Sequence, residues 1–233
     1  WPQNDVDLAG KKVGIIGTGA TAVQIIPEIA KVVGDLTVFQ RTPNWCTPLH
    51  NKKISYNRMQ EIKSNYGEIL ELCSQTPGCY IHSTDPRTTF EVTEQERWEF
   101  WEKLYAEPGF GIWQGNFSDM LTDRAANALM SEFLADKIRT RVKDAAVAER
   151  LIPKDHGFGT RRVPQETGYY ETFNRDNVHL VDINEDPIQE IFEGGVRTES
   201  SEIPFDVLIY ATGFDAITGA FERIGIEGLG GKN

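Results

Sequence analysis

The first part of the chain combines short apolar runs with one stretch of helical periodicity. Lys12–Ile16 is a short apolar run of strand type, and a glycine-rich turn follows it at once. Apolar side chains then recur at helical spacing as far as Val33, which predicts a helix. Pro27 lies inside this predicted helix and is expected to kink it. Leu36–Gln40 is a second apolar run. This order predicts a β-α-β unit.

Residues 49–155 follow a different pattern, in which apolar positions keep helical spacing. A capping box, Thr93-x-x-Glu96, marks the start of one predicted helix. The Met59 face and the three tryptophans of the segment are interpreted as helix core rather than as a cage around a substrate. The tryptophans are Trp98, Trp101 and Trp113. The predicted helical faces run from Met59 to Cys73, Trp98 to Tyr105, Leu129 to Arg141 and Ala145 to Ile152.

The last part of the chain returns to strand patterns. Val178–Val181 is short and β-branched, and Ile188–Phe192 and Val196–Thr198 flank a Gly-Gly pair, which predicts a hairpin. Asp206–Tyr210 is an apolar run of the kind expected for a strand buried on both faces. We therefore predict an α/β fold. Its Rossmann-like sheet would be built from residues 1–48 and 156–215, and a helical insertion of about 100 residues would occupy 49–155.

Composition excludes several classes of protein. The chain has 233 residues, a net charge of −11 and a pI of about 4.9, so nucleic acid, which needs a basic footprint, is not an expected partner. The longest apolar runs are about five residues, far short of the roughly 18 that cross a membrane. We see no signal peptide. Three cysteines without a CxxC and four histidines without ligand spacing predict no metal site and a cytoplasmic location.

The turn after the first strand has the spacing of a dinucleotide-binding motif, Gly17-x-Gly19-x-x-Ala22. Gly17 permits the tight turn, Gly19 lets the backbone approach a pyrophosphate, and Ala22 lets the helix pack closely on the strand. The helix N-terminus offers free N–H groups and a positive dipole to the phosphates. Because the motif follows a strand and opens a helix, it predicts a dinucleotide site. The alternative is a plain tight turn.

The end of the second strand indicates which dinucleotide binds. An NAD site usually places a carboxylate here, roughly 20 residues after the turn, whereas this chain has Arg41. A guanidinium fits a 2′-phosphate. A hydrogen bond to a charged group contributes roughly 1.5–3 kcal/mol, which predicts a preference of order 10–100-fold for NADP. A second basic pair, Arg161-Arg162, is either another anion site or a solvated surface pair.

Four motifs in this order resemble the Baeyer–Villiger monooxygenases, flavoproteins that insert oxygen beside a ketone. They are Phe39–Trp45, Gly159–Arg162, Tyr169–Arg175 and Tyr210–Asp215. Enzymes of that family carry FAD on one Rossmann-like domain and NADPH on a second, which this chain resembles over essentially its whole length. Trp1-Pro2 resembles the end of a family fingerprint. The resemblance therefore implies a fragment that lacks the flavin domain, with residues 216–233 as a linker toward it.

The resemblance also implies roles for individual residues. The glycine turn would hold the pyrophosphate, and Arg41 and Thr42 would hold the 2′-phosphate. Arg161 stands where the family usually has Lys, also near that phosphate, and Arg162 would be the catalytic arginine that lies over the flavin in the full enzyme. The implied cofactor-binding residues are Gly17, Thr18, Gly19, Ala20, Thr21, Ala22, Gln40, Arg41, Thr42, Arg161 and, in the segment where the two domains meet, Ala211, Thr212 and Gly213.

The function implied by the resemblance belongs to the full enzyme, which would convert a ketone to an ester or lactone with NADPH and O₂. The chain alone is expected to bind NADP(H) but, because it lacks a flavin site, not to bind FAD and not to oxidise ketones. A stand-alone NADP-binding sensor is the alternative, because this fold hosts many functions. A simple NADP dehydrogenase is disfavoured, because the chain has no Tyr-x-x-x-Lys pair.

Overall fold

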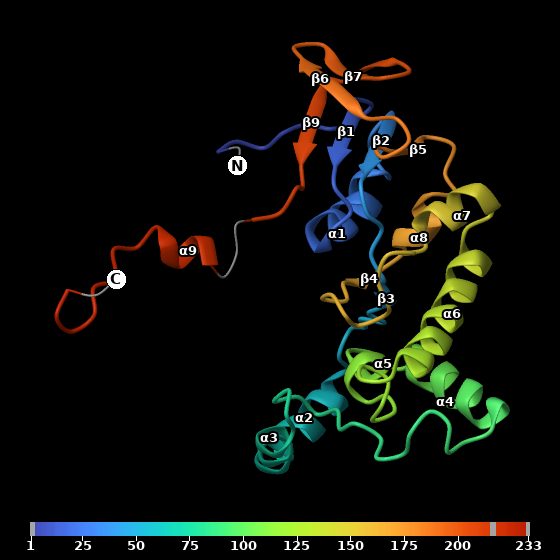
Figure 1. Ribbon diagram of the computed structural model, residues 1–233, viewed down its shortest axis with the longest axis vertical. Helices are drawn as coiled ribbons and strands as arrows, with labels where there is room; N and C mark the ends of the chain where they lie inside the picture. The colour runs from blue at the N-terminus through green and yellow to red at the C-terminus, as the bar shows by residue number, and fades with distance from the viewer. Residues whose placement is uncertain (1–2, 215–217, 232–233) are drawn as a thin grey trace.

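A parallel sheet forms the centre of the fold in the computed structural model, which describes residues 3–214 and 218–231 (Figure 1). Its strand order is β5-β2-β1-β9, and every pair is parallel. Counted along the chain this is the order 3-2-1-4, with which the Rossmann strand order 3-2-1-4-5-6 begins. The predicted α/β class with a parallel sheet is therefore confirmed. The strands are β1 Lys12–Ile16, β2 Asp35–Gln40, β5 Val178–Asp182 and β9 Val207–Tyr210.

Helix α1, Ala20–Ile29, follows the glycine turn and packs on the short helix α8, Tyr169–Thr172. Its apolar face enters the core, as its spacing predicts. The helix continues through Pro27, which lies in its last turn, and ends at Ile29. The prediction of helical structure as far as Val33 was wrong. Proline lacks an N–H and its ring clashes with the carbonyl four residues before it, so it disfavours a longer helix around it.

Between the short parallel strands β3, Thr47–Pro48, and β4, Gln165–Glu166, the chain forms six helices (Figure 1). The predicted capping box at Thr93 and Glu96 is confirmed, because both of its hydrogen bonds are present. The buried apolar side chains of these helices, Trp101 among them, belong to the same core as those of the sheet. The helices are α2 Tyr56–Ser64, α3 Tyr66–Gln75, α4 Glu94–Ala106, α5 Gly111–Gln114, α6 Arg124–Arg141 and α7 Ala145–Leu151.

The prediction that these helical faces and tryptophans form core was wrong in part. The face from Met59 to Cys73 is divided between α2 and α3, with Asn65 between them, and neither helix buries a residue. Trp98 packs its ring edge-to-face on the buried Phe133 but remains 41% exposed, whereas Trp101, one turn later, is buried. Helical spacing identifies an apolar face, but a face becomes core only where another element covers it.

A small antiparallel sheet, β6-β7-β8, lies at the amino ends of the parallel strands (Figure 1). Its members are β6 Ile188–Phe192, β7 Gly195–Thr198 and β8 Glu202–Pro204, and the predicted hairpin is confirmed. Strand β9 was expected to be buried on both faces, and this was wrong. It lies at the edge of its sheet, three of its residues are half-buried, and Tyr210 is exposed.

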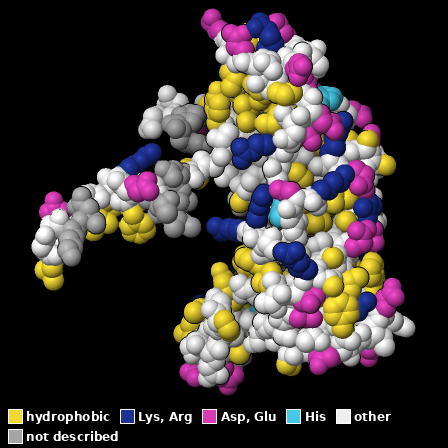
Figure 2. Space-filling model, in the orientation of Figure 1, with side chains coloured by type: hydrophobic (Ala, Val, Ile, Leu, Met, Phe, Trp, Pro, Cys, Tyr) yellow, Lys and Arg dark blue, Asp and Glu magenta, His cyan; other side chains and the backbone are white. Residues whose placement is uncertain are grey.

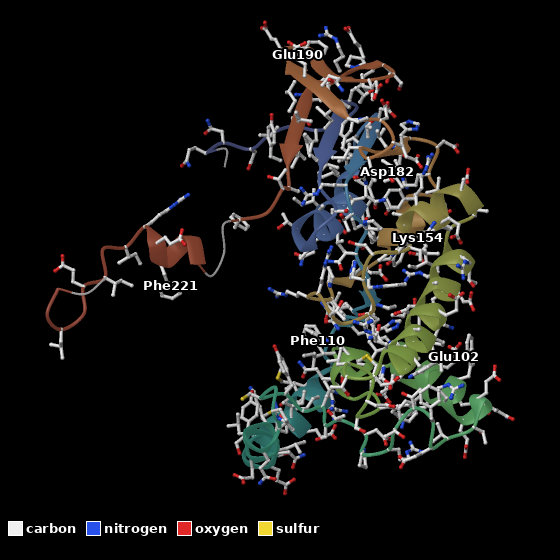
Figure 3. All side chains as sticks on the ribbon, in the orientation of Figure 1. Glu102, Phe110, Lys154, Asp182, Glu190 and Phe221 are labelled. Atoms are coloured by element: carbon white, nitrogen blue, oxygen red, sulfur yellow. The ribbon has the colours of Figure 1, made fainter. Side chains whose placement is uncertain are left out.

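Beyond β9 the chain leaves the sheet. Helix α9, Thr218–Glu222, stands apart from the rest of the molecule in Figure 1, and its Phe221 side chain is exposed (Figure 3). No helix among residues 3–214 and 218–231 is long and apolar enough to cross a bilayer.

A buried ion pair joins the helical segment to the sheet side of the molecule. Arg141, the last residue of α6, places Nη1 2.7 Å from Oε1 of Glu166, whose side chain is fully buried on β4. The same guanidinium donates to both carboxylate oxygens of Glu171, at 2.6 and 2.7 Å. It also donates to the Tyr105 hydroxyl at 3.0 Å. One side chain therefore connects α4, α6, β4 and α8.

Candidate nucleotide-binding site

A groove of about 460 Å³ lies at the carboxyl ends of β1, β2 and β9. In open parallel sheets ligands bind at this edge, where the strand order changes direction. Most of the predicted cofactor-binding residues meet here. The lining consists of Ile16, Gly17, Thr18, Gly19, Phe39, Arg41, Thr42, Pro43, Asn44, Arg161, Ile183, Ala211, Thr212 and Gly213. A larger hollow of about 860 Å³, between α6 and residues 152–160, contains none of the predicted residues.

The two glycines of the turn have different surroundings. Gly17 has φ +111°, and a Cβ placed on it would lie 2.4 Å from the Ala211 carbonyl oxygen. Only glycine fits this backbone conformation and this close approach to the end of β9. Gly19 has an ordinary φ of −79°, and an added Cβ would meet nothing within 4 Å. The space in front of Gly19, at the N-terminus of α1, is therefore open to a phosphate.

Two arginines lie at the rim of the groove. Arg41 is exposed, and its guanidinium has no carboxylate within ion-pair distance among the residues described. Arg161 places Nη2 3.0 Å from Oδ2 of Asp155. A hydrogen bond from His156, helped by the charge of Arg161, lowers the pKa of Asp155, so this carboxylate is ionised at neutral pH. Figure 2 shows Lys and Arg side chains gathered in the middle of this face, between the sheet and the helical segment.

The structure does not bring every predicted residue to the groove. Ala20, Thr21 and Ala22 belong to the first turn of α1 and do not line it, and Ala22 is buried in the core. Gln40 is fully buried, and its Nε2 donates to the Arg150 carbonyl at 2.7 Å. Trp1, Pro2 and Asp215 lie outside the described residues.

Arg162 does not line the groove either. Its side chain is exposed, and its carbonyl accepts a hydrogen bond from Asn44 Nδ2 at 3.4 Å. The side chain is therefore free to meet a group outside this chain, whereas the backbone is tied to the loop after β2.

Sequence reasoning missed five lining residues, Ile16, Phe39, Pro43, Asn44 and Ile183. Ile16 ends β1, and Phe39, Pro43 and Asn44 belong to the motif Phe39–Trp45 but received no role. Ile183 directly follows β5, so its place at the carboxyl edge of the sheet could have been found once that strand was recognised as parallel.

The Tyr169–Arg175 motif serves the core rather than the groove. Tyr169 and Tyr170 are buried, and burial raises the pKa of both hydroxyls. The Tyr170 hydroxyl accepts a hydrogen bond from the backbone N–H of Cys46 at 3.2 Å. Burial also raises the pKa of the Cys46 thiol, with the charge of Glu166 acting in the same direction. The thiol therefore stays protonated and is a poor nucleophile.

Comparison with known proteins gave consistent relatives, although no family model matches the chain. The chain is 54% identical over 234 residues to 2-oxo-Δ³-4,5,5-trimethylcyclopentenylacetyl-CoA monooxygenase of Pseudomonas putida, and the alignment covers 98% of this chain and 43% of that protein. It is 40% identical over 235 residues to cyclopentanone 1,2-monooxygenase of a Comamonas species, and the alignment covers 100% of this chain and 43% of that protein. A Baeyer–Villiger monooxygenase of Pseudooceanicola batsensis is 39% identical, covering 99% and 42%.

A solved structure gives the same result. The crystal structure of OTEMO in complex with FAD and NADP superposes with a TM-score of 0.96 at 52% identity, covering 100% of this chain and 44% of that one. The chain thus spans less than half the length of the proteins it matches. The resemblance seen in the sequence motifs is confirmed.

Proposed function

We propose that this chain, which belongs over its whole length with the Baeyer–Villiger monooxygenases, is the NADP(H)-binding portion of a flavin-dependent monooxygenase. The observation that supports this most strongly is the groove at the carboxyl ends of β1, β2 and β9, with Arg41 at its rim, where it forms no ion pair with any described residue. A guanidinium in place of the usual carboxylate favours a nucleotide with a 2′-phosphate over one with a 2′-hydroxyl.

The residues present fit such a nucleotide. The open space before Gly19 and the first N–H groups of α1 would hold the pyrophosphate, with Ala20 and Thr21 adding backbone donors. Arg41, Thr42 and Arg161 would hold the 2′-phosphate at the other end of the groove. When bound, NADPH supplies a hydride. This chain would orient the nucleotide by holding its pyrophosphate and its 2′-phosphate.

A second portion of the enzyme is expected to cover the β9 side. Tyr210, the last residue of β9, is exposed, and Phe214, four residues later, is 91% exposed. An apolar surface of this kind marks an interaction site. We propose that the FAD-carrying part of the enzyme packs here and that Ala211, Thr212 and Gly213 form the junction. Arg162 would then reach the flavin as the catalytic arginine, where its charge stabilises the negative charge that develops during oxygen transfer.

We propose the following division of the chain. Residues 1–48 and 156–215 form the NADP-binding part, 49–155 form a helical insertion, and 216–233 form a linker toward the flavin-carrying part. The relatives' names, which include both cyclopentanone and acetone monooxygenases, point to a ketone as substrate of the whole enzyme. The product would be the corresponding ester or lactone.

The test uses the chain as given and two readouts. Titration of NADPH fluorescence reports binding, and NADPH absorbance in the presence of cyclopentanone and oxygen reports turnover. We expect saturable binding of NADPH and no ketone-dependent consumption. Consumption that depends on the ketone, or stoichiometric flavin in the purified chain, would show that the chain is a complete enzyme rather than the nucleotide-binding portion.

A further inference from the structure

The loop after β2 is held through its carbonyl oxygens by side chains of two other segments. The Thr18 hydroxyl, in the glycine turn, donates to the Thr42 carbonyl at 2.9 Å. The side-chain amide of Asn184, after β5, donates to the Arg41 carbonyl. Two successive carbonyl groups are therefore turned toward donors outside their own loop.

Both donors are themselves fixed. Thr18 is only 5% exposed, so water has little access to its hydroxyl. Asn184 lies in a turn in which Oδ1 of Asp182 accepts hydrogen bonds from its backbone N–H at 2.9 Å and its side-chain amide at 2.8 Å. Figure 3 labels Asp182 beside the parallel sheet. The same turn is attached to β2, because the Ile183 N–H donates to the Gln40 carbonyl at 2.9 Å.

This arrangement fixes the direction of one backbone donor. In a trans peptide the C=O and the following N–H point to opposite sides, and no cis peptide is present among the described residues. Since the Arg41 carbonyl points to Asn184, the Thr42 N–H points away from Asn184. Within the described part of the chain this N–H has no hydrogen-bond acceptor. It is thus a free donor on a groove-lining residue, directly after Arg41.

We propose that Thr18 and Asn184 are positioning residues for the 2′-phosphate, acting through the backbone of Arg41 and Thr42. They hold the two carbonyl oxygens, which would otherwise bring partial negative charge near the phosphate. They thereby present the Thr42 N–H and the Arg41 guanidinium to a single phosphate group. The inference rests on the proposed NADP site and assigns to Thr18 a role different from a contact with the pyrophosphate.

The two roles of Thr18 predict different outcomes. A hydroxyl has one hydrogen to donate, and in this structure it is donated to the Thr42 carbonyl. A contact with the pyrophosphate would contribute equally to NADP⁺ and NAD⁺, because both contain that group. A positioning role toward the 2′-phosphate contributes to NADP⁺ alone.

The experiment is calorimetric titration of the chain with NADP⁺ and with NAD⁺. The variants are Thr18→Val and Asn184→Leu, which remove the donors at similar side-chain size, and Thr18→Ser, which keeps the hydroxyl. Thr172→Val is the matched control, because its hydroxyl is similarly buried (6% exposed) and donates to the Gly168 carbonyl at 2.7 Å, away from the groove. Thermal melting of each variant verifies folding.

We expect Thr18→Val and Asn184→Leu each to reduce the preference for NADP⁺ over NAD⁺ about three- to tenfold, as the loss of one hydrogen bond implies. Thr18→Ser and Thr172→Val should keep the preference of the parent chain. Equal weakening of both nucleotides in Thr18→Val, or an unchanged preference in both donor variants, overturns the inference while leaving the NADP site intact. If the parent chain binds neither nucleotide, the proposed function itself fails.

Discussion

Replacing Arg141 with methionine is expected to destabilise the fold strongly. The Glu166 carboxylate has no exposed surface, and Arg141 is the cation paired with it at 2.7 Å. Removal of one member of a buried pair leaves a charge without compensation and costs about 3–5 kcal/mol. The pair with Glu171 is half exposed and adds about 1 kcal/mol or less. We therefore expect Arg141→Met to lose about 4 kcal/mol of unfolding free energy.

Urea unfolding followed by circular dichroism measures this loss. With a slope of about 2–3 kcal/mol per molar urea, the midpoint should fall by roughly 1.3–2 M. Arg58→Met is the matched control, since its ion pair with Glu61 is exposed on both sides and should contribute about 1 kcal/mol or less. The double variant Arg141→Met with Glu166→Gln should lose less than the sum of the single variants. If Arg141→Met is no less stable than the Arg58→Met control, the buried pair does not hold the segments together.

Three further predictions concern the turn, the thiols and the rim carboxylate. Gly17→Ala should lose about 2 kcal/mol or more of unfolding free energy and melt at a lower temperature, because the added methyl would meet the Ala211 carbonyl at positive φ. Gly19→Ala should melt like the parent chain and weaken NADP⁺ binding. Iodoacetamide at neutral pH should modify the exposed Cys79 in the folded chain. It should modify Cys46 only after denaturation, because burial raises the pKa of that thiol. A Cys46 adduct detected by mass spectrometry in the folded chain would contradict this prediction. The hydrogen bond from His156 lowers the pKa of Asp155 in the folded chain. The ionised carboxylate therefore stabilises the fold above the unfolded pKa of about 3.9, and this stabilisation is lost as pH falls through the folded pKa. The stability difference between the parent chain and Asp155→Asn should vanish in acid, and a difference that stays constant with pH would contradict this.

The sequence predicted the parts of the fold that depend on local pattern. The strands β1 and β2, the glycine turn and the capping box at Thr93 follow from spacing and from residues close together in the chain. Burial depends on what covers a face, which local pattern does not contain. For this reason β9 reads as a fully buried strand but lies at a sheet edge, and the Met59 face reads as core but remains uncovered.

The candidate site divides in the same way. The glycine turn and Arg41 were found because their roles follow from backbone spacing and from the end of a strand. Gln40 belongs to the same motif, yet its amide is bonded to the Arg150 carbonyl, 110 residues away in the chain, which only the tertiary structure reveals. The pair of Arg161 with Asp155 and the hold of Asn184 on Arg41 also join segments that sequence reasoning treated separately.

The most direct test of the account is calorimetric titration of this chain with NADP⁺ and NAD⁺, repeated on Arg41→Ala and Arg161→Ala. The guanidinium of Arg41 has no carboxylate partner among the described residues, so its full interaction is available to a 2′-phosphate, whereas Arg161 is shared with Asp155. We predict a preference for NADP⁺ of order 10–100-fold, most of it lost in Arg41→Ala and a smaller part in Arg161→Ala. Equal binding of the two nucleotides by the parent chain, or an unchanged preference in Arg41→Ala, would contradict the assignment of this groove to NADP.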